Sequence, residues 1–236
     1  MAILLSASCI NAKTLVVYYS FTNNVHTIVN NLHTQIDADV IRIEPAEKGI
    51  DYADNNYAAG SALISAIRNN PNDVASYPAI DPVEVNLDEY DMVIVAAPLW
   101  WSQMAAPLQT FLFQHGKEMK GKRIGLIVSS ASSGISSVVA DAKRLIPQGI
   151  FLEPNLWIRS SQVSNCHSMI EQWLKGIDYT TITSSISAVG SDGEEEVIAR
   201  YNMGGQRIAA EQQIVGISIT LYRKAGKNYS RKSIVK

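Results

Sequence analysis

A run of hydroxyl and amide side chains follows the first strand-like segment of the chain. Ser20-Phe-Thr-Asn-Asn24 comes directly after the β-branched and aromatic residues 14–19, and Val25 begins a segment with helical periodicity. Free backbone N–H groups at a helix N-terminus, together with Ser, Thr and Asn side chains, form a neutral binding site for an anion such as a phosphate. The alternative is an ordinary cluster of helix-capping residues, which has the same composition.

Two further loops carry residues that suit a planar ring. The apolar run 92–97 is followed by Pro98-Leu-Trp-Trp101, and the run 124–128 is followed by the small, polar residues Ser129-Ser-Ala-Ser-Ser-Gly134. One phosphate site, one aromatic wall and one small polar loop would together suit a flat phosphorylated cofactor. Taken alone, a tryptophan pair is more typical of a core or an interface, and Tyr52 and Tyr57 are either pocket residues or ordinary surface packing.

The three loops lie within an alternating pattern of strands and helices between residues 13 and 177. Strands are predicted at 14–19, 39–43, 92–97, 124–128 and 151–158, with helices around 25–32, 58–68, 107–112, 136–145 and 166–174. Right-handed crossovers between such units give a parallel sheet with helices on both faces. Open α/β sheets bind their ligands beyond the carboxyl ends of the strands, which is where the three loops are expected.

The three loops resemble those of the flavodoxin-like family of short FMN proteins. The family's phosphate loop, Ser/Thr-x-Thr-Gly-Asn-Thr, is matched by residues 20–25, its second loop by 97–101 with Pro107 and Phe111-Leu112 behind it, and its third loop, Thr-x-Gly-Gly-Ser-Gly, by 129–134. The resemblance implies an α/β three-layer sandwich with a five-stranded parallel sheet in the order 2-1-3-4-5. It implies FMN as the cofactor, bound by Ser20, Thr22, Asn23, Asn24, Val25, Pro98, Leu99, Trp100, Trp101, Ser129, Ser130, Ser133 and Gly134.

The same resemblance implies a redox function without a catalytic side chain or a metal. The protein would carry electrons or use NAD(P)H to reduce quinone-like acceptors, so its partner would be a redox protein or a small-molecule electron acceptor. An oligomer stays open. The alternative is a flavodoxin-fold binding or surface module that has lost FMN.

Several positions depart from the family pattern. Asn23 replaces a glycine, and asparagine is among the better-tolerated residues if the position needs a positive φ. Val25 replaces a threonine that would donate to the phosphate. Ser129, Ala131 and Ser132 replace a threonine and two glycines, which adds bulk near the ring. Val25 and the altered third loop favour the alternative, whereas the tryptophan pair and the retained hydroxyls favour FMN.

Charge and composition argue against several other classes of protein. The 236 residues include 20 Lys and Arg and 22 Asp and Glu, a net charge of −2, so the basic excess of nucleic-acid-binding domains is lacking. No apolar run has the length of a membrane-spanning helix, and two cysteines cannot form a disulfide scaffold. His26 and His33 are seven residues apart and have no evident third ligand, which favours a solvated helix face over a metal site.

The two ends of the chain differ in texture from residues 13–177. Residues 1–12, MAILLSASCINA, resemble the end of a secretory leader without its basic start, and Cys9 stands where a lipoprotein would be processed. Residues 178–236 predict a β-rich antiparallel tail with strands at 197–201, 206–209, 215–222 and 230–235 and turns at 190–193, 204–205 and 225–228, while 180–187 show no helical period. The tail resembles the sorting tails of exported bacterial proteins, such as those of type IX secretion. We therefore expect a periplasmic or cell-surface protein; the alternative is a cytoplasmic one with a hairpin extension.

Overall fold

The computed structural model describes residues 12–185, 196–202, 206–208, 216–224 and 227–235. The chain divides into two compact units, one of residues 11–185 and one that contains the tail strands. The predicted leader falls almost wholly on residues 1–11, outside the described residues. So do the predicted turns at 190–193, 204–205 and 225–226.

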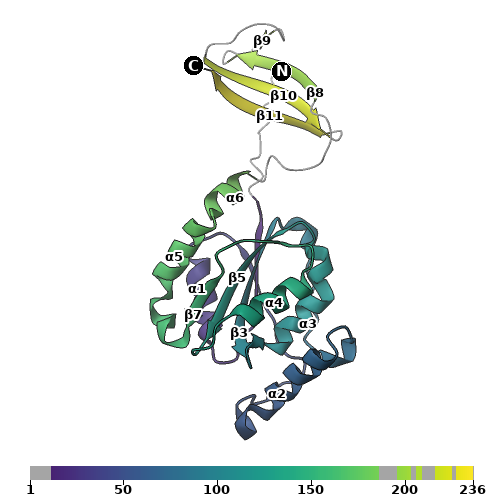
Figure 1. The fold of residues 1–236 in the computed structure, drawn as a ribbon. Coiled ribbons are helices and arrows are strands. Elements are labelled where there is room, and N and C mark those ends of the chain that lie inside the picture. Colours follow the sequence, from purple (N-terminus) through teal and green to yellow (C-terminus); the bar gives the residue numbers. More distant parts are fainter. Residues whose placement is uncertain (1–11, 186–195, 203–205, 209–215, 225–226, 236) are drawn as a thin grey trace. The chain divides into compact units, whose positions relative to one another are not determined.

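A parallel sheet forms the middle of the first unit (Figure 1). Its order is β2-β1-β3-β5-β6, and β7 also pairs with β5. The predicted order 2-1-3-4-5 is therefore confirmed, because β6 and β7 together take the fifth position. The strands are β1 (Thr14–Tyr18), β2 (Asp39–Arg42), β3 (Met92–Trp100), β5 (Arg123–Ser130), β6 (Ile150–Phe151) and β7 (Leu156–Arg159).

The fifth predicted strand, 151–158, is interrupted. β6 pairs with the start of β5, through Ile124 and Phe151, and β7 pairs with its end, through Ile127 and Leu156. Pro154 lies between the two pieces, and a proline nitrogen cannot donate a hydrogen bond to a neighbouring strand. The prediction of one continuous strand was wrong over residues 152–155.

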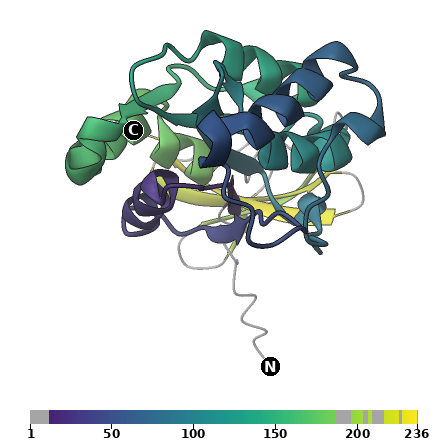
Figure 2. The same cartoon turned by 90° about the horizontal axis from the view of Figure 1, so that it is seen from below.

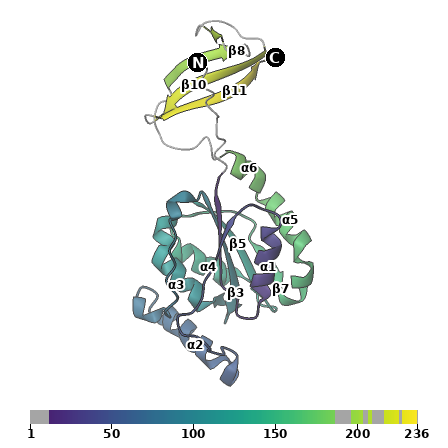
Figure 3. The same ribbon diagram turned by 180° about the vertical axis from the view of Figure 1, so that it is seen from behind.

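Helices cover both faces of the sheet (Figures 1 and 3). On one face α1 (Asn24–His33) and α5 (Cys166–Gly176) bury Ile28 and Ile170. Three helices cover the other face: α2 (Asp54–Asn69), α3 (Ala106–His115) and α4 (Ser136–Leu145). All three contribute residues to the core on that side, among them Phe111 and Val138. This is the predicted three-layer sandwich. Short 3₁₀ helices span Val74–Ser76, Leu87–Glu89, Gly116–Met119 and Ser160–Asn165.

The start of α2 departs from regular helix. Asn55, Asn56 and Tyr57 have φ values of 45°, 57° and 63°, in the left-handed region, so the regular helix begins close to the predicted residue 58. Figure 2 shows this end of the unit, with α2 in blue. Asparagine tolerates the left-handed region better than most residues, whereas a tyrosine there is uncommon. The segment carries Tyr57 to the mouth of the cavity described below.

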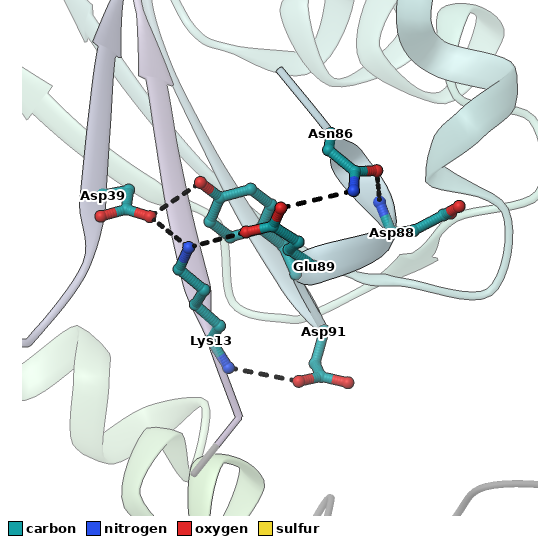
Figure 4. A network of polar contacts seen from close by, with 7 residues as sticks. Lys13, Asp39, Asn86, Asp88, Glu89 and Asp91 are labelled. Atoms are coloured by element: carbon teal, nitrogen blue, oxygen red, sulfur yellow. Dashed lines mark hydrogen bonds and ion pairs between the residues drawn. The ribbon is translucent and has the colours of Figure 1, made fainter. Parts of the chain in front are cut away.

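A charged network fixes the opposite end of the sheet (Figure 4). Lys13 Nζ lies 2.8 Å from Asp39 Oδ2 and 3.2 Å from Glu89 Oε2, while the Tyr90 hydroxyl donates to Asp39 Oδ2 over 2.7 Å. The hydrogen bonds that Lys13 donates to Asp39 and Glu89 raise the pKa of Lys13, and the bond from Lys13 lowers the pKa of Asp39. The backbone N–H of Lys13 also donates to Asp91 Oδ2. The network thus joins the residues that lead into β1 and β3 to the first residue of β2.

Residues 179–185 form a helix, α6 (Tyr179–Ser185), and not the irregular segment that the sequence suggested. Thr183 Oγ1 donates to the carbonyl of Tyr179. This bond engages a hydroxyl that could otherwise compete with the backbone hydrogen bonds of the helix. The Tyr179 hydroxyl lies 3.0 Å from Thr14 Oγ1, and the Ala12 N–H donates to the Thr183 carbonyl over 3.2 Å. These contacts outweigh the weak helix propensity of Thr and Ser, and they place α6 with the first unit.

The tail forms a small antiparallel sheet, as predicted. Its strands run in the order β11-β10-β8-β9, with Leu221 opposite Ala199 and Ser230. Lys227 and Asn228, predicted as part of a turn, belong to the last strand. No helix among the described residues is long and apolar enough to cross a membrane. The four strands are β8 (Glu196–Asn202), β9 (Arg207–Ile208), β10 (Gly216–Lys224) and β11 (Lys227–Val235).

We expect the tail sheet to be dispensable for the stability of the first unit, whereas α6 contributes to it. A chain that ends after Ser185 keeps the contacts of Tyr179 and Thr183 and should melt within about 2 °C of the same unit in the full chain. A chain that ends after Ile177 loses these contacts. If they contribute about 1 kcal/mol to the free energy of unfolding, its melting temperature should be lower by roughly 4 °C. Calorimetry of both chains checks this. Insolubility of the chain that ends after Ser185 would contradict the separation.

Candidate functional site

A cavity of about 510 Å³ lies at the carboxyl ends of β1, β3 and β5. The loops after these three strands all reach it, as predicted from parallel strands. Residues from the region of α2 complete the wall, together with Ser160. The lining residues are Phe21, Thr22, Asn24, Tyr52, Asn56, Tyr57, Gly60, Pro98, Leu99, Trp100, Trp101, Ser129, Ser130, Ala131 and Ser160.

The structure brings together eight of the thirteen residues predicted for the site. They are Thr22, Asn24, Pro98, Leu99, Trp100, Trp101, Ser129 and Ser130. The other five, Ser20, Asn23, Val25, Ser133 and Gly134, do not line the cavity. Most of these five shape the loops that do, as the following contacts show.

The first loop is held in shape by Ser20 and Asn23. Ser20 is buried, and its Oγ accepts the N–H of His26 over 3.2 Å. Asn23 has φ 63° and ψ −1°, so the expectation that asparagine replaces glycine at a position with positive φ is confirmed. The Asn23 carbonyl accepts the N–H of Thr27, which starts α1. The amides of Asn24 and Val25 belong to the first helical turn and have no acceptor within the helix, so they can serve an anion.

Val25 contributes to the site through its backbone alone. Its side chain is 2% exposed and packs in the core between the sheet and α1 and α5. In this chain, position 25 therefore faces the core and not the cavity. The replacement of a threonine by valine adds to core packing on this side of the sheet, and it leaves Thr22 as the hydroxyl of this loop that lines the cavity.

The two tryptophans of the second loop have different environments. Trp100 is half-buried in an aromatic cluster, with ring centroids 5.6 Å from Tyr19 and 4.9 Å from Tyr52. Burial raises the pKa of both tyrosines, so they remain protonated and neutral. Trp101 is 41% exposed and contacts Tyr57 at the rim of the cavity, at 6.2 Å between centroids. Trp100 thus forms a wall and Trp101 an edge.

The backbone of this loop is strained. Trp101 and Ser102, with φ 45° and 65°, form the two-residue turn between β3 and β4 (Gln103–Met104). Turns with two positive φ values favour Asn-Gly, and a left-handed residue with a side chain costs on the order of 1–2 kcal/mol. The turn also depends on Gly60, where a Cβ atom would lie 2.9 Å from Trp101 Cζ3.

The third loop is organised by a tryptophan that the sequence did not single out. Trp157 Nε1 donates to Ser130 Oγ over 2.8 Å, and Ser130 Oγ donates to the Ser133 carbonyl over 2.8 Å. The Arg159 guanidinium lies 4.6 Å from the centre of the Trp157 ring. Ser133 thus acts through its carbonyl. A Cβ at Gly134 would meet nothing within 4 Å, so this glycine has no steric role here.

The cavity wall carries no charged side chain. Among the described residues that line it, every polar group is a hydroxyl, an amide, an indole or a backbone group. Such a wall can bind an anion through neutral donors and can hold a flat ring against Trp100. Among the described lining residues there is no carboxylate, imidazole, amine or thiol, and redox chemistry at such a wall would be supplied by a bound cofactor.

Several lining residues were missed by the sequence analysis. Tyr52 and Tyr57 were left between pocket and surface, and both line the cavity; Tyr52 is 5% exposed. Phe21 could have been predicted as a lining residue, because it lies inside the phosphate loop. No sequence signal marked the remaining lining residues, because their position depends on how α2 and the loop after β7 fold back. These residues are Asn56, Gly60, Ala131 and Ser160.

A second cavity, of about 590 Å³, lies at the amino ends of the strands. Lys13, Asp39 and Tyr179 line it, among others, and these three are engaged in the network and the α6 contact described above. Ligands of open α/β sheets bind at the carboxyl ends, which favours the smaller cavity as the functional site. No group of three or more His, Cys, Asp or Glu among the described residues could hold a metal ion.

Comparison with known proteins identifies the family. The family model described as flavodoxin matches residues 13–177. The chain belongs to the flavodoxin family. Two solved structures, of proteins assigned as flavoproteins from Bacteroides eggerthii DSM 20697 and Bacteroides uniformis ATCC 8492, are each 24% identical to it, with TM-scores of 0.57 and 0.56. They cover 71% and 70% of this chain, which covers 99% of each of them.

A third solved structure carries a cofactor. It is a flavoprotein in complex with FMN from Lactobacillus acidophilus NCFM, 20% identical, with a TM-score of 0.51. The match covers 65% of this chain and 97% of that one. These likenesses show the fold. Among curated proteins, none matches the chain.

We expect Gly60→Ala to displace Trp101 without unfolding this flavodoxin. Alanine favours a helix over glycine by about 1 kcal/mol, which offsets part of the clash with the indole. The near-ultraviolet circular dichroism should change while the melting temperature moves little. Gly176→Ala is the control, because a Cβ there would meet only Pro154 at 3.7 Å. An unchanged aromatic spectrum in Gly60→Ala would contradict the packing of Trp101 on α2.

Proposed function

We propose that this chain binds FMN in the 510 Å³ cavity and acts as a redox flavoprotein. It would pass electrons to a partner protein or use NAD(P)H to reduce a small quinone-like acceptor. One observation carries the proposal: the three loops that resemble those of FMN proteins converge on a single neutral cavity walled by Trp100. The FMN complex of the neighbour from Lactobacillus acidophilus NCFM supports it.

The residues present fit the parts of FMN. The phosphate would be held by Thr22, by Asn24 and by the first-turn amides of α1, where the helix dipole favours a negative charge. The ring would lie between Trp100 and the loop of Ser129 and Ser130. The cavity volume falls within the usual range for small-molecule sites, about 300–1,000 Å³.

When bound, FMN would supply the redox chemistry, and the chain would bind, orient and shield it. Hydroxyls and amides would fix the phosphate without an ion pair. Trp100, held by Tyr19 and Tyr52, would exclude water from one side of the ring. Donors and acceptors would reach the cavity past its rim, where Tyr57 and Trp101 are 52% and 41% exposed.

We also propose that the protein is exported. The apolar and small residues at 1–12 and the β-rich tail after residue 185 support this proposal. The N-terminal sequence of the protein purified from its natural host tests it. A mature chain that starts near Lys13 agrees with export, and an intact Met1 on a protein confined to the cytoplasm contradicts it.

Titration with FMN and with riboflavin tests the proposed cofactor. Riboflavin has the ring but no phosphate, so the wild type should bind FMN more tightly. Thr22→Val removes one hydroxyl, and a hydrogen bond to a charged group contributes about 1.5–3 kcal/mol, so FMN affinity should fall by about tenfold or more. Riboflavin affinity should stay within about twofold. Flavin fluorescence quenching measures all of these affinities.

Thr27→Val is the matched control, because Thr27 is an exposed residue of α1 that does not line the cavity. Its affinities should equal those of the wild type. Absence of saturable FMN binding by the wild type would favour the alternative of a flavodoxin-fold module that has lost its cofactor. Equal affinity for FMN and riboflavin would contradict the phosphate site but leave the ring site standing.

A further inference from the structure

The turn that carries the two tryptophans has little to hold it in place locally. The hairpin of β3 and β4 has two register pairs, Leu99 with Met104 and Trp100 with Gln103. Its two turn residues, Trp101 and Ser102, both have positive φ and lack the preference of Asn-Gly for this conformation. Contacts from elsewhere must therefore stabilise it.

Met104 is the residue where such contacts converge. In an antiparallel hairpin the hydrogen-bonded and non-hydrogen-bonded pairs alternate. The pair next to a two-residue turn is the hydrogen-bonded one, so the N–H and C=O of Met104 in the next pair point away from β3. Met104 is fully buried, and buried backbone groups need partners.

Two side chains, Asp141 and Gln109, supply these partners, and a third, Arg144, joins them into a closed ring, which we call the Met104 clamp. Asp141 Oδ2 accepts the Met104 N–H over 2.9 Å, and Gln109 Nε2 donates to the Met104 carbonyl over 2.7 Å. Arg144 Nη2 donates to Gln109 Oε1 over 2.8 Å and lies 3.5 Å from Asp141 Oδ1. The clamp takes the place that a further strand would have beside β4.

The clamp is anchored on two helices, and two of its three side chains are buried. Gln109, on α3, is 1% exposed, and Asp141, on α4, is 6% exposed. Burial raises the pKa of Asp141, while its bond from the Met104 N–H and the charge of Arg144 oppose that rise. Arg144 Nη1 also donates to the hydroxyl of Tyr77. A buried carboxylate is costly, so the presence of Asp141 beside a backbone N–H, with the exposed Arg144 guanidinium at its other oxygen, indicates a specific role.

We propose that Gln109, Asp141 and Arg144 are positioning residues that hold the strained Trp101-Ser102 turn, and with it Trp100, against the cavity. They touch neither the cavity nor its ligand. Their effect on FMN rests on the proposed function, whereas their effect on the turn does not.

Hydrogen exchange in the cofactor-free protein tests the positioning directly. Gln109→Met removes the donor to the Met104 carbonyl at nearly constant size, so the amides of residues 101–104 should exchange at least about tenfold faster. Asp141→Leu should do the same, while Asp141→Asn, which keeps an oxygen for the Met104 N–H, should remain closer to the wild type. FMN affinity should fall by about fivefold or more in Gln109→Met, because the wall is less pre-organised.

Ile170→Ala is the control for a loss of stability alone, since Ile170 is fully buried on α5 across the sheet. At a temperature well below both melting points, it should leave exchange at 101–104 and FMN affinity within about twofold of the wild type. Unchanged exchange in Gln109→Met, or an equal effect of Ile170→Ala, would overturn the proposal. If the wild type binds no FMN, the proposed function fails and the exchange result alone decides on the clamp.

Discussion

Parallel pairing of β1, β3 and β5 is the constraint on which the rest of this protein depends. Leu15, Val93 and Ile124 are register partners across the three strands, and all three are fully buried. Because the strands run in the same direction, the loops that follow them must meet at one edge of the sheet. Residues some 110 positions apart in the sequence, from Thr22 to Ser130, are thereby brought to one cavity.

The cavity is shaped largely by residues that do not line it. Ser20 holds the first helical turn, Trp157 holds the third loop through Ser130, and the Met104 clamp holds the tryptophan turn. All of these partners lie on strands, helices or their ends, which are more rigid than loops. A neutral wall of aromatic rings and hydroxyls results, and its strain at Trp101 is balanced by buried contacts in the core.

Local sequence signals predicted the frame of the fold, and tertiary contacts explain where they failed. Continuous apolar runs revealed the buried strands, because this effect is local, and the glycine of the family pattern at position 23 pointed to the left-handed conformation that Asn23 adopts. The break at Pro154 has a local cause that the sequence contains, since a proline nitrogen cannot donate to a neighbouring strand. The helix at Tyr179–Ser185 instead depends on a contact with Thr14, which no window of sequence contains. Val25 was assigned to the phosphate by a family pattern, although the helical period also places it in the core with Ile28. Gly60 was missed because its role arises only when α2 meets the tryptophan turn.

The most direct test of the account is a backbone amide chemical-shift map of the protein titrated with FMN. Saturable shifts are expected in residues 22–25, 99–101 and 129–131, at the carboxyl ends of the three strands. No shift is expected around Lys13, Asp39 and Tyr179, which line the cavity at the other end. Shifts confined to that second cavity, or no saturable shifts at all, would contradict the central claim that the three loops form one FMN site.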